Sequence, residues 1–154
     1  MKQAKIKKVV VGPARHGLGV FAGRRLSAGR YVGRVHGRTL SDPHYSSNYC
    51  MDLGDHLSLE PTAPFRYLNH SCAPNCCLVQ LKVEYEDGSA PDKEIWLEAA
   101  RDISPGEELT IDYGWPPQSA MRCECGSPNC RGWIVAEGLL NAVAEEDAIV
   151  QPGM

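Results

Sequence analysis

A short central stretch gathers many of the reactive side chains of the chain. Residues 66–76 read Arg-Tyr-Leu-Asn-His-Ser-Cys-Ala-Pro-Asn-Cys, so that an amide, an imidazole, a hydroxyl and a thiol follow one another before a turn. Proline fixes φ and asparagine tolerates unusual backbone geometry, and Ala-Pro-Asn therefore marks the turn. The stretch is either a polar loop with a capped turn or a site that does chemistry. Its own composition does not decide between the two.

Seven cysteines supply a second set of reactive groups. They are Cys72, Cys76 and Cys77 in or directly after the central stretch, Cys123, Cys125 and Cys130 near the C-terminal end, and Cys50 apart from both groups. An odd number of cysteines in a reducing compartment favours metal ligands or buried thiols over disulfides. Two groups that lie far apart in the sequence suggest one shared site.

The C-terminal cysteine group has the spacing of a metal knuckle. The turn Gly-Ser-Pro-Asn between Cys125 and Cys130 can fold the third sulfur back towards Cys123 and Cys125. Structural zinc takes four tetrahedral ligands and is commonly held by cysteine sets. The fourth ligand has to come from elsewhere, and Cys72 or Cys76 is the available donor. We interpret the group as part of a zinc site, with reduced thiols as the alternative.

The elements that must position these residues are short and rich in β-structure. Fifteen glycines and 11 prolines among 154 residues indicate many turns, and 43% hydrophobic residues indicate one globular domain. Strands are expected at residues 6–11, 19–22, 31–36, 57–60 and 107–114. A helix is the candidate structure for residues 136–150, although Gly138 weakens it.

The clearest expected element is a hairpin. Apolar residues alternate with polar ones from Val79 to Tyr85, which is typical of a strand with one face on the core. Residues 86–91 form an Asp, Gly and Pro turn, and residues 94–99 return along the first strand. The fold class that follows is mostly β, with small sheets and few short helices.

The charge of the chain bears on its partners. A formal net charge of -3 does not support a basic nucleic-acid-binding face, so we expect a basic partner and no direct contact with nucleic acid. No apolar run reaches the roughly 20 residues that a membrane helix needs. The N-terminal residues do not have the pattern of a secretion signal. These observations predict an intracellular protein.

Gly17 and Gly19 flank Leu18 between the first two expected strands. A Gly-x-Gly on its own indicates a tight turn. The alternative is a backbone left bare of Cβ atoms so that a ligand can lie against it. A phosphate-binding loop is not indicated, because the third glycine and the long following helix are missing.

These segments together resemble one known family, the SET-domain protein lysine methyltransferases. The matching segments, in the family's order, are Gly17-Leu18-Gly19-Val20, the region of Tyr49, residues 66–76, residues 107–114, and Cys130-Arg131-Gly132-Trp133. The resemblance covers residues from about 5 to 134, and the two central motifs are highly specific in combination. It implies a SET domain at 5–115, a post-SET zinc-binding segment at 119–134, and a tail at 135–154 as a candidate helix.

The resemblance also implies a fold and a ligand set. The fold is one of small β-sheets in which Asn69-His70-Ser71 is threaded with the segment ending at Tyr113, as a pseudoknot. The implied cofactor, S-adenosylmethionine, lies against the Gly17-Leu18-Gly19 backbone. Its other implied contacts are Arg66, Asn69, His70 and Trp133. The implied zinc ligands are Cys72, Cys123, Cys125 and Cys130, which leaves Cys50, Cys76 and Cys77 without a defined role.

The implied reaction is methyl transfer from a sulfonium to a lysine amine. It is an in-line displacement with no covalent intermediate, so proximity and orientation supply most of the acceleration. The lysine must be neutral, and a desolvating channel beside a cationic sulfonium lowers its pKa. Tyr113 matches the catalytic tyrosine of the family, which orients the amine, and Tyr49 is expected to line the same channel.

Departures from the family pattern refine the prediction. No cysteine-rich segment precedes the domain in this sequence, so substrate recognition by such a region is not expected. Ile111 and Leu78 stand where some relatives have a tyrosine or phenylalanine that limits the number of methyl groups. Apolar residues leave more room at these positions, which predicts multiple methylation.

The best substrate hypothesis is a histone tail, because the net charge and the family both indicate a basic partner. A non-histone basic protein and a catalytically silent SET-like module that binds a basic peptide are the alternatives, and Tyr113 favours the enzyme. A cysteine hydrolase is disfavoured because His70 lies only two residues from Cys72 and no orienting acid is evident. We expect the nucleus or chromatin in a eukaryote or virus, and the cytoplasm in a bacterium.

Overall fold

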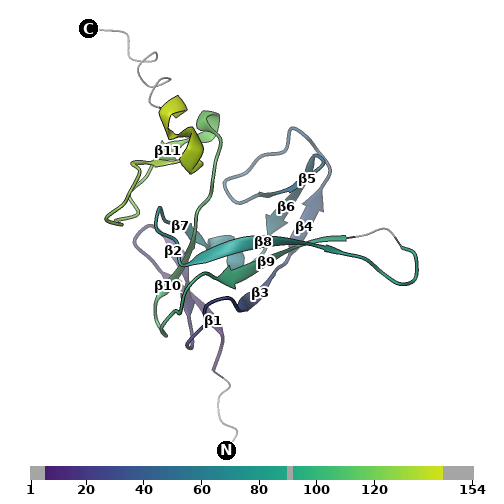
Figure 1. Ribbon diagram of the computed structural model, residues 1–154, viewed down its shortest axis with the longest axis horizontal. Coiled ribbons are helices and arrows are strands. Elements are labelled where there is room, and N and C mark those ends of the chain that lie inside the picture. The colour runs from purple at the N-terminus through teal and green to yellow at the C-terminus, as the bar shows by residue number, and fades with distance from the viewer. Residues whose placement is uncertain (1–5, 90–91, 144–154) are drawn as a thin grey trace, which may run out of the picture.

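Short strands make up much of the chain, as the sequence predicted. The computed structural model describes residues 6–89 and 92–143 (Figure 1). The strands of the first half are β1 (Val9–Pro13), β2 (Leu18–Ala22), β3 (Tyr31–Val35), β4 (Gly37–Leu40), β5 (Met51–Gly54) and β6 (Leu57–Pro61). Those of the second half are β7 (Asn69–His70), β8 (Cys76–Val83), β9 (Asp92–Ala99), β10 (Glu108–Ile111), β11 (Met121–Arg122) and β12 (Trp133–Ile134). Three short 3₁₀ helices in the same residues are η1 (Phe65–Tyr67), η2 (Pro117–Ser119) and η3 (Glu137–Leu139).

The first sheet joins segments that lie far apart in the sequence. Its strand order is β1-β2-β10-β7, with β10 antiparallel to β2 and parallel to β7. The register pairs Thr110 with Asn69 and Ile111 with His70. The two motifs that the sequence predicted to cross therefore lie side by side.

A buried asparagine holds β10 to the segment that follows β7. The Asn75 side chain accepts the Thr110 N–H at 2.9 Å and donates to the Glu108 carbonyl at 2.7 Å. The Ser71 N–H donates to the Ile111 carbonyl at 3.0 Å, which extends the β7–β10 pairing by one bond. Because Asn75 is only 4% exposed, water cannot replace it as a partner for the two β10 groups.

Two three-stranded sheets cover the rest of the domain. One has the order β3-β9-β8 and the other the order β4-β6-β5. The predicted hairpin is confirmed as the antiparallel β8–β9 pair, with Leu78 opposite Leu97 (Figure 1). Alternate residues of β9, including Ile95 and Leu97, turn towards the core.

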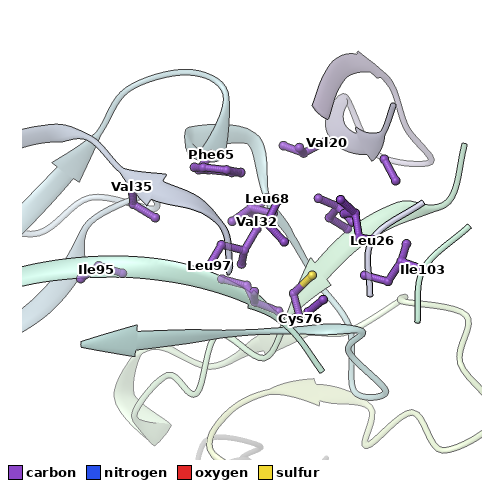
Figure 2. Close-up of a cluster of buried hydrophobic side chains, with 14 of the residues drawn as sticks. Val20, Leu26, Val32, Val35, Phe65, Leu68, Cys76, Ile95, Leu97 and Ile103 are labelled. Carbon is purple, nitrogen blue, oxygen red and sulfur yellow. The ribbon is translucent and has the colours of Figure 1, made fainter. Parts of the chain in front are cut away.

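The core lies where these sheets meet. Val20, Leu97, Ile103 and Leu109 are fully buried and come from different parts of the chain. Figure 2 shows Phe65, the first residue of η1, and Leu68, which follows η1, gathered with residues of β2, β3 and β9. The core thus anchors the start of the central stretch among residues of the sheets, including Leu109 of β10.

Three expectations on the elements need correction or limits. The strand expected at residues 6–11 begins only at Val9 and continues to Pro13, and one further bond, from the Gly23 N–H to the Lys8 carbonyl, follows the β1–β2 register beyond its first pair. Strand β4 was not predicted, since its residues are mostly exposed and show no alternation. Of the helix expected at residues 136–150, residues 137–143 are helical, and the remainder lies outside the described residues.

The C-terminal segment forms its own small sheet of β11 and β12, with Arg122 opposite Trp133. The division of the chain at residues 5–115, 119–134 and 135–154 stays a prediction. None of the helices in the described part of the chain has the length and apolar character needed to cross a membrane.

Asn75→Ala is expected to destabilise the fold by about 2–4 kcal/mol, because it leaves the Thr110 N–H and the Glu108 carbonyl buried without partners. Urea unfolding followed by circular dichroism measures this free energy of unfolding. Asn48→Ala is the matched control at an exposed position and should change it by less than about 0.5 kcal/mol. Equal effects of the two substitutions would contradict the role given to Asn75.

Candidate active site and metal centre

Two cavities meet at the end of β10. The larger has a volume of about 700 Å³ and lies between the β5–β6 strands and the segment after β10; the smaller, of about 370 Å³, lies between the β1–β2 turn, β7 and the cysteine knuckle. Tyr113 lines both cavities, as does Met121. A group bound in one cavity can therefore meet a group bound in the other beside the Tyr113 side chain.

The Tyr113 phenol is held in one orientation. Its hydroxyl donates to the Leu68 carbonyl at 2.5 Å, and its ring packs against the rings of His70 and Trp115. Burial raises the pKa of Tyr113 to about 12, helped by the nearby Tyr49 phenol. The phenol thus stays neutral at physiological pH. Because its hydrogen is committed to Leu68, its oxygen can offer lone pairs to a donor.

His70 links the tyrosine segment to the cysteines. Its Nδ1 accepts the Tyr113 N–H at 3.1 Å, so Nδ1 carries no hydrogen in this arrangement. Its Nε2 then carries the hydrogen and lies 3.4 Å from the Cys72 sulfur. Burial lowers the pKa of His70, which favours this neutral form. The Asp112 carboxylate lies 3.6 Å from Nδ1. In this tautomer Nδ1 carries no hydrogen and donates none to that carboxylate.

Asn69 fixes the β1–β2 turn to β10. Its amide donates to the Leu18 carbonyl at 2.9 Å and to the Glu108 carboxylate at 2.8 Å. A Cβ on Gly19 would lie 2.5 Å from that same carboxylate and 2.8 Å from the Ala14 Cβ, so any larger residue would force its neighbours to shift. Gly17 has a φ of +73° and open space where a Cβ would be.

Only part of the expected cofactor set lines the smaller cavity. Asn69 and His70 do, whereas Gly17, Leu18, Gly19, Arg66 and Trp133 are not among its lining residues. The Trp133 ring instead packs on the guanidinium of Arg122, 4.3 Å from the ring centroid, and Arg122 itself lines the cavity.

Sequence reasoning missed other residues of this cavity. The lining also includes Arg15, His16, Glu108, Thr110, Arg122 and Glu124. His16 and Glu124 come within 3.9 Å of each other, so the β1–β2 turn reaches the knuckle at the rim. The adjacency of Arg15 and His16 to the Gly-x-Gly turn was the available signal, but polar residues in turns are too common for it to stand out.

Tyr49 and Arg66 lie together in the larger cavity. The Arg66 guanidinium stacks 3.9 Å from the centroid of the Tyr49 ring and donates to the Glu60 carboxylate at 2.7 Å. Leu78 and Ile111 line the same cavity. The structure thus places the expected channel residue Tyr49 and the two expected size-determining positions around the space that Tyr113 faces.

The four predicted metal ligands converge. The sulfurs of Cys72, Cys123, Cys125 and Cys130 all lie within 4.8 Å of one another. A Zn–S bond of about 2.3 Å in tetrahedral geometry separates sulfurs by about 3.8 Å, and the Cys72 and Cys123 sulfurs are 3.8 Å apart. The four thiols could hold a zinc ion.

The remaining cysteines lie elsewhere. Cys76 is 1% exposed and belongs to the hydrophobic core, where burial raises the pKa of its thiol to about 12. Cys77 is exposed on β8, and Cys50 hydrogen-bonds within its own loop to Ser47. The geometry therefore separates Cys72 from Cys76, two candidates that the spacing alone left open.

An ion pair ties the cysteine cluster to the tyrosine segment. Arg131 donates from its guanidinium to both oxygens of Asp112 at 3.0 Å, and its backbone N–H lies 3.3 Å from the Cys72 sulfur. The same guanidinium bonds the Val135 carbonyl at 2.9 Å. Asp112 precedes Tyr113, so the position of the knuckle is coupled to that of the tyrosine.

Comparisons with known proteins agree on one family. The family model described as SET domain matches residues 17–114. The Schizosaccharomyces pombe protein named histone-lysine N-methyltransferase, H3 lysine-4 specific, is 31% identical over 149 residues, covering 86% of this chain and 16% of that protein. The Arabidopsis thaliana histone-lysine N-methyltransferase ASHR3 is 29% identical, covering 84% of this chain and 28% of that protein. The chain thus spans less than a third of the length of either relative.

Solved structures share the fold. A crystal structure of KRYPTONITE in complex with mCHH DNA, H3(1-15) peptide and SAH matches with a TM-score of 0.66 and 26% identity, over 86% of this chain and 30% of that chain. A second KRYPTONITE structure, with mCHG DNA and SAH, matches with a TM-score of 0.65 and 28% identity, over 79% of this chain and 27% of that chain. With the family model matching from Gly17 to Gly114, this chain belongs to the SET domain family.

Proposed function

We propose that this chain is an S-adenosylmethionine-dependent protein-lysine N-methyltransferase. One observation carries the proposal: Tyr113 lines two separate cavities, with its phenol held at their junction. A two-substrate transfer needs such a junction, because the donor and the acceptor have to meet while each keeps its own binding site.

The comparisons support the same reaction. The relatives bear the name histone-lysine N-methyltransferase, and the KRYPTONITE structures contain SAH, the product that remains when S-adenosylmethionine has lost its methyl group. When bound, S-adenosylmethionine supplies a methyl group activated by its sulfonium charge. In the proposal, Asn69 and His70 contact it in the smaller cavity, and the Gly17-Leu18-Gly19 backbone borders it.

Arg66 and Trp133 were also predicted to contact the cofactor. Arg66 lines the larger cavity, and Trp133 packs on Arg122 beside the smaller one. Contact between Trp133 and the cofactor is proposed through the Arg122 side of the cavity. Arg66 is the less direct of the two, because Glu60 and Tyr49 already surround its guanidinium.

The larger cavity is the proposed site of the acceptor lysine. Tyr49, Leu78, Ile111 and Tyr113 supply apolar and aromatic surface beside polar lining residues such as Asp52 and Asp112. Removal from water lowers the pKa of an amine, so an acceptor amine packed against these four side chains is favoured in the neutral form that the displacement requires. The Tyr113 oxygen, whose hydrogen is donated to Leu68, accepts from the amine and directs its lone pair towards the smaller cavity.

A structural zinc ion is proposed at the four sulfurs of Cys72, Cys123, Cys125 and Cys130. Structural zinc stabilises small segments that lack their own hydrophobic core. The short β11–β12 sheet is such a segment, and it forms one wall of the smaller cavity through Arg122 and Ile134.

The proposed acceptor is a basic protein tail, with a histone tail as the first candidate. The H3 peptide in a KRYPTONITE structure supports this class of acceptor. The net charge of -3 is compatible with a basic partner and gives no support for direct nucleic-acid binding. A histone acceptor would place the chain on chromatin, whereas a non-histone basic protein is the alternative.

Tyr113→Phe is expected to lower methyl transfer about 100-fold or more, because the acceptor amine loses its orienting oxygen. Transfer of radiolabel from S-adenosylmethionine to core histones measures the activity, and calorimetry measures cofactor binding, which should persist. Tyr85→Phe is the matched control, since Tyr85 is exposed near the β8–β9 turn.

Full activity of Tyr113→Phe would remove this tyrosine from the mechanism. Cofactor binding by the wild-type chain without any labelled histone would point to a non-histone acceptor, which a panel of other basic proteins tests. No label on either panel would favour a silent peptide-binding module.

The wild-type product is expected to carry more than one methyl group, because Leu78 and Ile111 leave room beside Tyr113. Leu78→Phe should shift the product towards a single methyl group by narrowing the cavity. Mass spectrometry of the acceptor peptide after long incubation measures both. Leu81→Phe, on the opposite face of β8, is the control, and a wild-type product that stops at one methyl group contradicts the prediction.

The purified chain is expected to contain about one zinc ion, and Cys72→Ser should lose most of it. Elemental analysis measures the zinc content, and thermal unfolding measures the accompanying loss of stability. Cys77→Ser is the control because Cys77 lies outside the sulfur cluster. Equal zinc content in both variants would exclude Cys72 as a ligand.

A further inference from the structure

Glu60 on β6 has a carboxylate whose two oxygens hold different parts of the chain. Its Oε1 accepts from Arg66 at 2.7 Å. Its Oε2 accepts from the hydroxyls of Ser47, at 2.7 Å, and Tyr45, at 2.9 Å. The side chain is 16% exposed, so these partners replace most of its water. The bonds also lower the pKa of Glu60 and keep it ionised.

The Ser47 bond continues to the backbone of the next residues. The Ser47 hydroxyl accepts the N–H groups of Tyr49, at 3.1 Å, and Cys50, at 3.0 Å. A serine hydroxyl has one hydrogen and two lone pairs, and all three are used here once it donates to Glu60. The orientation of this hydroxyl, and with it the backbone at Tyr49, therefore depends on the carboxylate.

Arg66 provides a second connection to the same tyrosine. Its guanidinium lies 3.9 Å from the centroid of the Tyr49 ring while it donates to Glu60. A cation over an aromatic face is attracted to it, and the ion pair fixes where that cation lies. Glu60 thus reaches the backbone of Tyr49 through Ser47 and its ring through Arg66.

The loop that carries Tyr49 has little else to hold it. None of residues 41–50 is buried, and Tyr49 is itself 44% exposed. Among the described residues, both side-chain hydrogen bonds that leave this loop for a neighbouring strand end on Glu60. A loop without a buried side chain is positioned largely by its polar contacts, and here those contacts converge on one carboxylate.

We propose that Glu60 is a positioning residue that holds Tyr49 against the wall of the larger cavity. The inference rests on the proposed function in taking that cavity as the acceptor's. Residues 46–51 line it, whereas Glu60 and the residues of this loop do not line the smaller cavity. Loss of the carboxylate should therefore weaken use of the acceptor and leave cofactor binding unchanged.

Glu60→Gln is the decisive variant, because it keeps the size of the side chain and removes one acceptor. The amide oxygen will face Arg66, which can only donate, and the NH₂ group will face the loop. Ser47 already accepts two hydrogen bonds and cannot take a third. The bond from Ser47 to residue 60 is then lost and Tyr49 is released.

Two measurements test the proposal. Hydrogen exchange of the Tyr49 and Cys50 amides should become about tenfold faster in Glu60→Gln, as expected for loss of a hydrogen bond to a charged group. In steady-state kinetics with a histone H3 tail peptide, or with the acceptor that the label panel identifies, KM for the acceptor should rise about tenfold. The dissociation constant for S-adenosylmethionine, from calorimetry, should stay unchanged.

Glu94→Gln is the matched control. Glu94 is 14% exposed, pairs with Arg34 at 3.0 Å and accepts from the Trp96 indole at 2.8 Å, yet it lines neither cavity. It should leave loop exchange and the acceptor KM unchanged. Ser47→Ala should speed this exchange at least as much, because it also removes the acceptor of the two N–H groups. Adding Glu60→Gln to it should change the exchange little, since the Ser47 bond to Glu60 is already gone.

Unchanged exchange at Tyr49 and Cys50 in Glu60→Gln would overturn the proposal, as would an equal weakening of acceptor and cofactor. If the wild-type chain transfers no methyl group to any acceptor, the proposed function fails on its own. The exchange measurement then still decides whether Glu60 holds Tyr49, because it needs no activity.

Discussion

The parallel pairing of β7 with β10 is the contact on which the site depends. It joins residues 69–70 to residues 110–111, and only a few bonds hold it. Two further bonds, from the buried Asn75 side chain, hold β10 to the segment that follows β7. Parallel strands so far apart in sequence have to be closed against a large loss of chain entropy. A fully satisfied, buried amide supplies a specific contact where the strands are too short to do so.

This pairing also explains why the predicted functions cluster. Cys72 follows β7 by two residues and Tyr113 follows β10 by two, so the metal ligand and the tyrosine leave the same pair of strands. His70 accepts the Tyr113 N–H on one side of its ring and faces the Cys72 sulfur on the other. The Arg131–Asp112 ion pair connects the cysteine knuckle to the residue before Tyr113. A change at the cysteines therefore reaches the tyrosine through contacts, without any need for a large movement.

The sequence was sufficient for features set by residue type and poor for those set by distant packing. The β8–β9 hairpin was predictable because alternation is a local signal, and the group of Cys123, Cys125 and Cys130 because thiol spacing is constrained by metal geometry. Cys72 as the fourth member of the cluster came from the family resemblance. The contact between β7 and β10 was predicted only from the family resemblance, because the periodicity of a sequence does not show which distant strands pair. Gly19 was read as a surface for a ligand, but its missing Cβ also makes room for the Glu108 carboxylate. Such a contact depends on the pairing of β2 with β10, which the residues of neither strand indicate alone.

The two cavities are built by different physical means, and this bears on how each can change. The tyrosine between them stands on η1 and the hydrophobic core, where Phe65 and Leu68 are buried and close packing resists substitution. The outer wall of the larger cavity is a loop with no buried residue, held by the Glu60 carboxylate. Polar contacts at a half-exposed surface can be exchanged without creating a cavity in the core. Substitutions that adapt the larger cavity to a different acceptor are therefore easier to accommodate at residues 41–50 than substitutions around Tyr113.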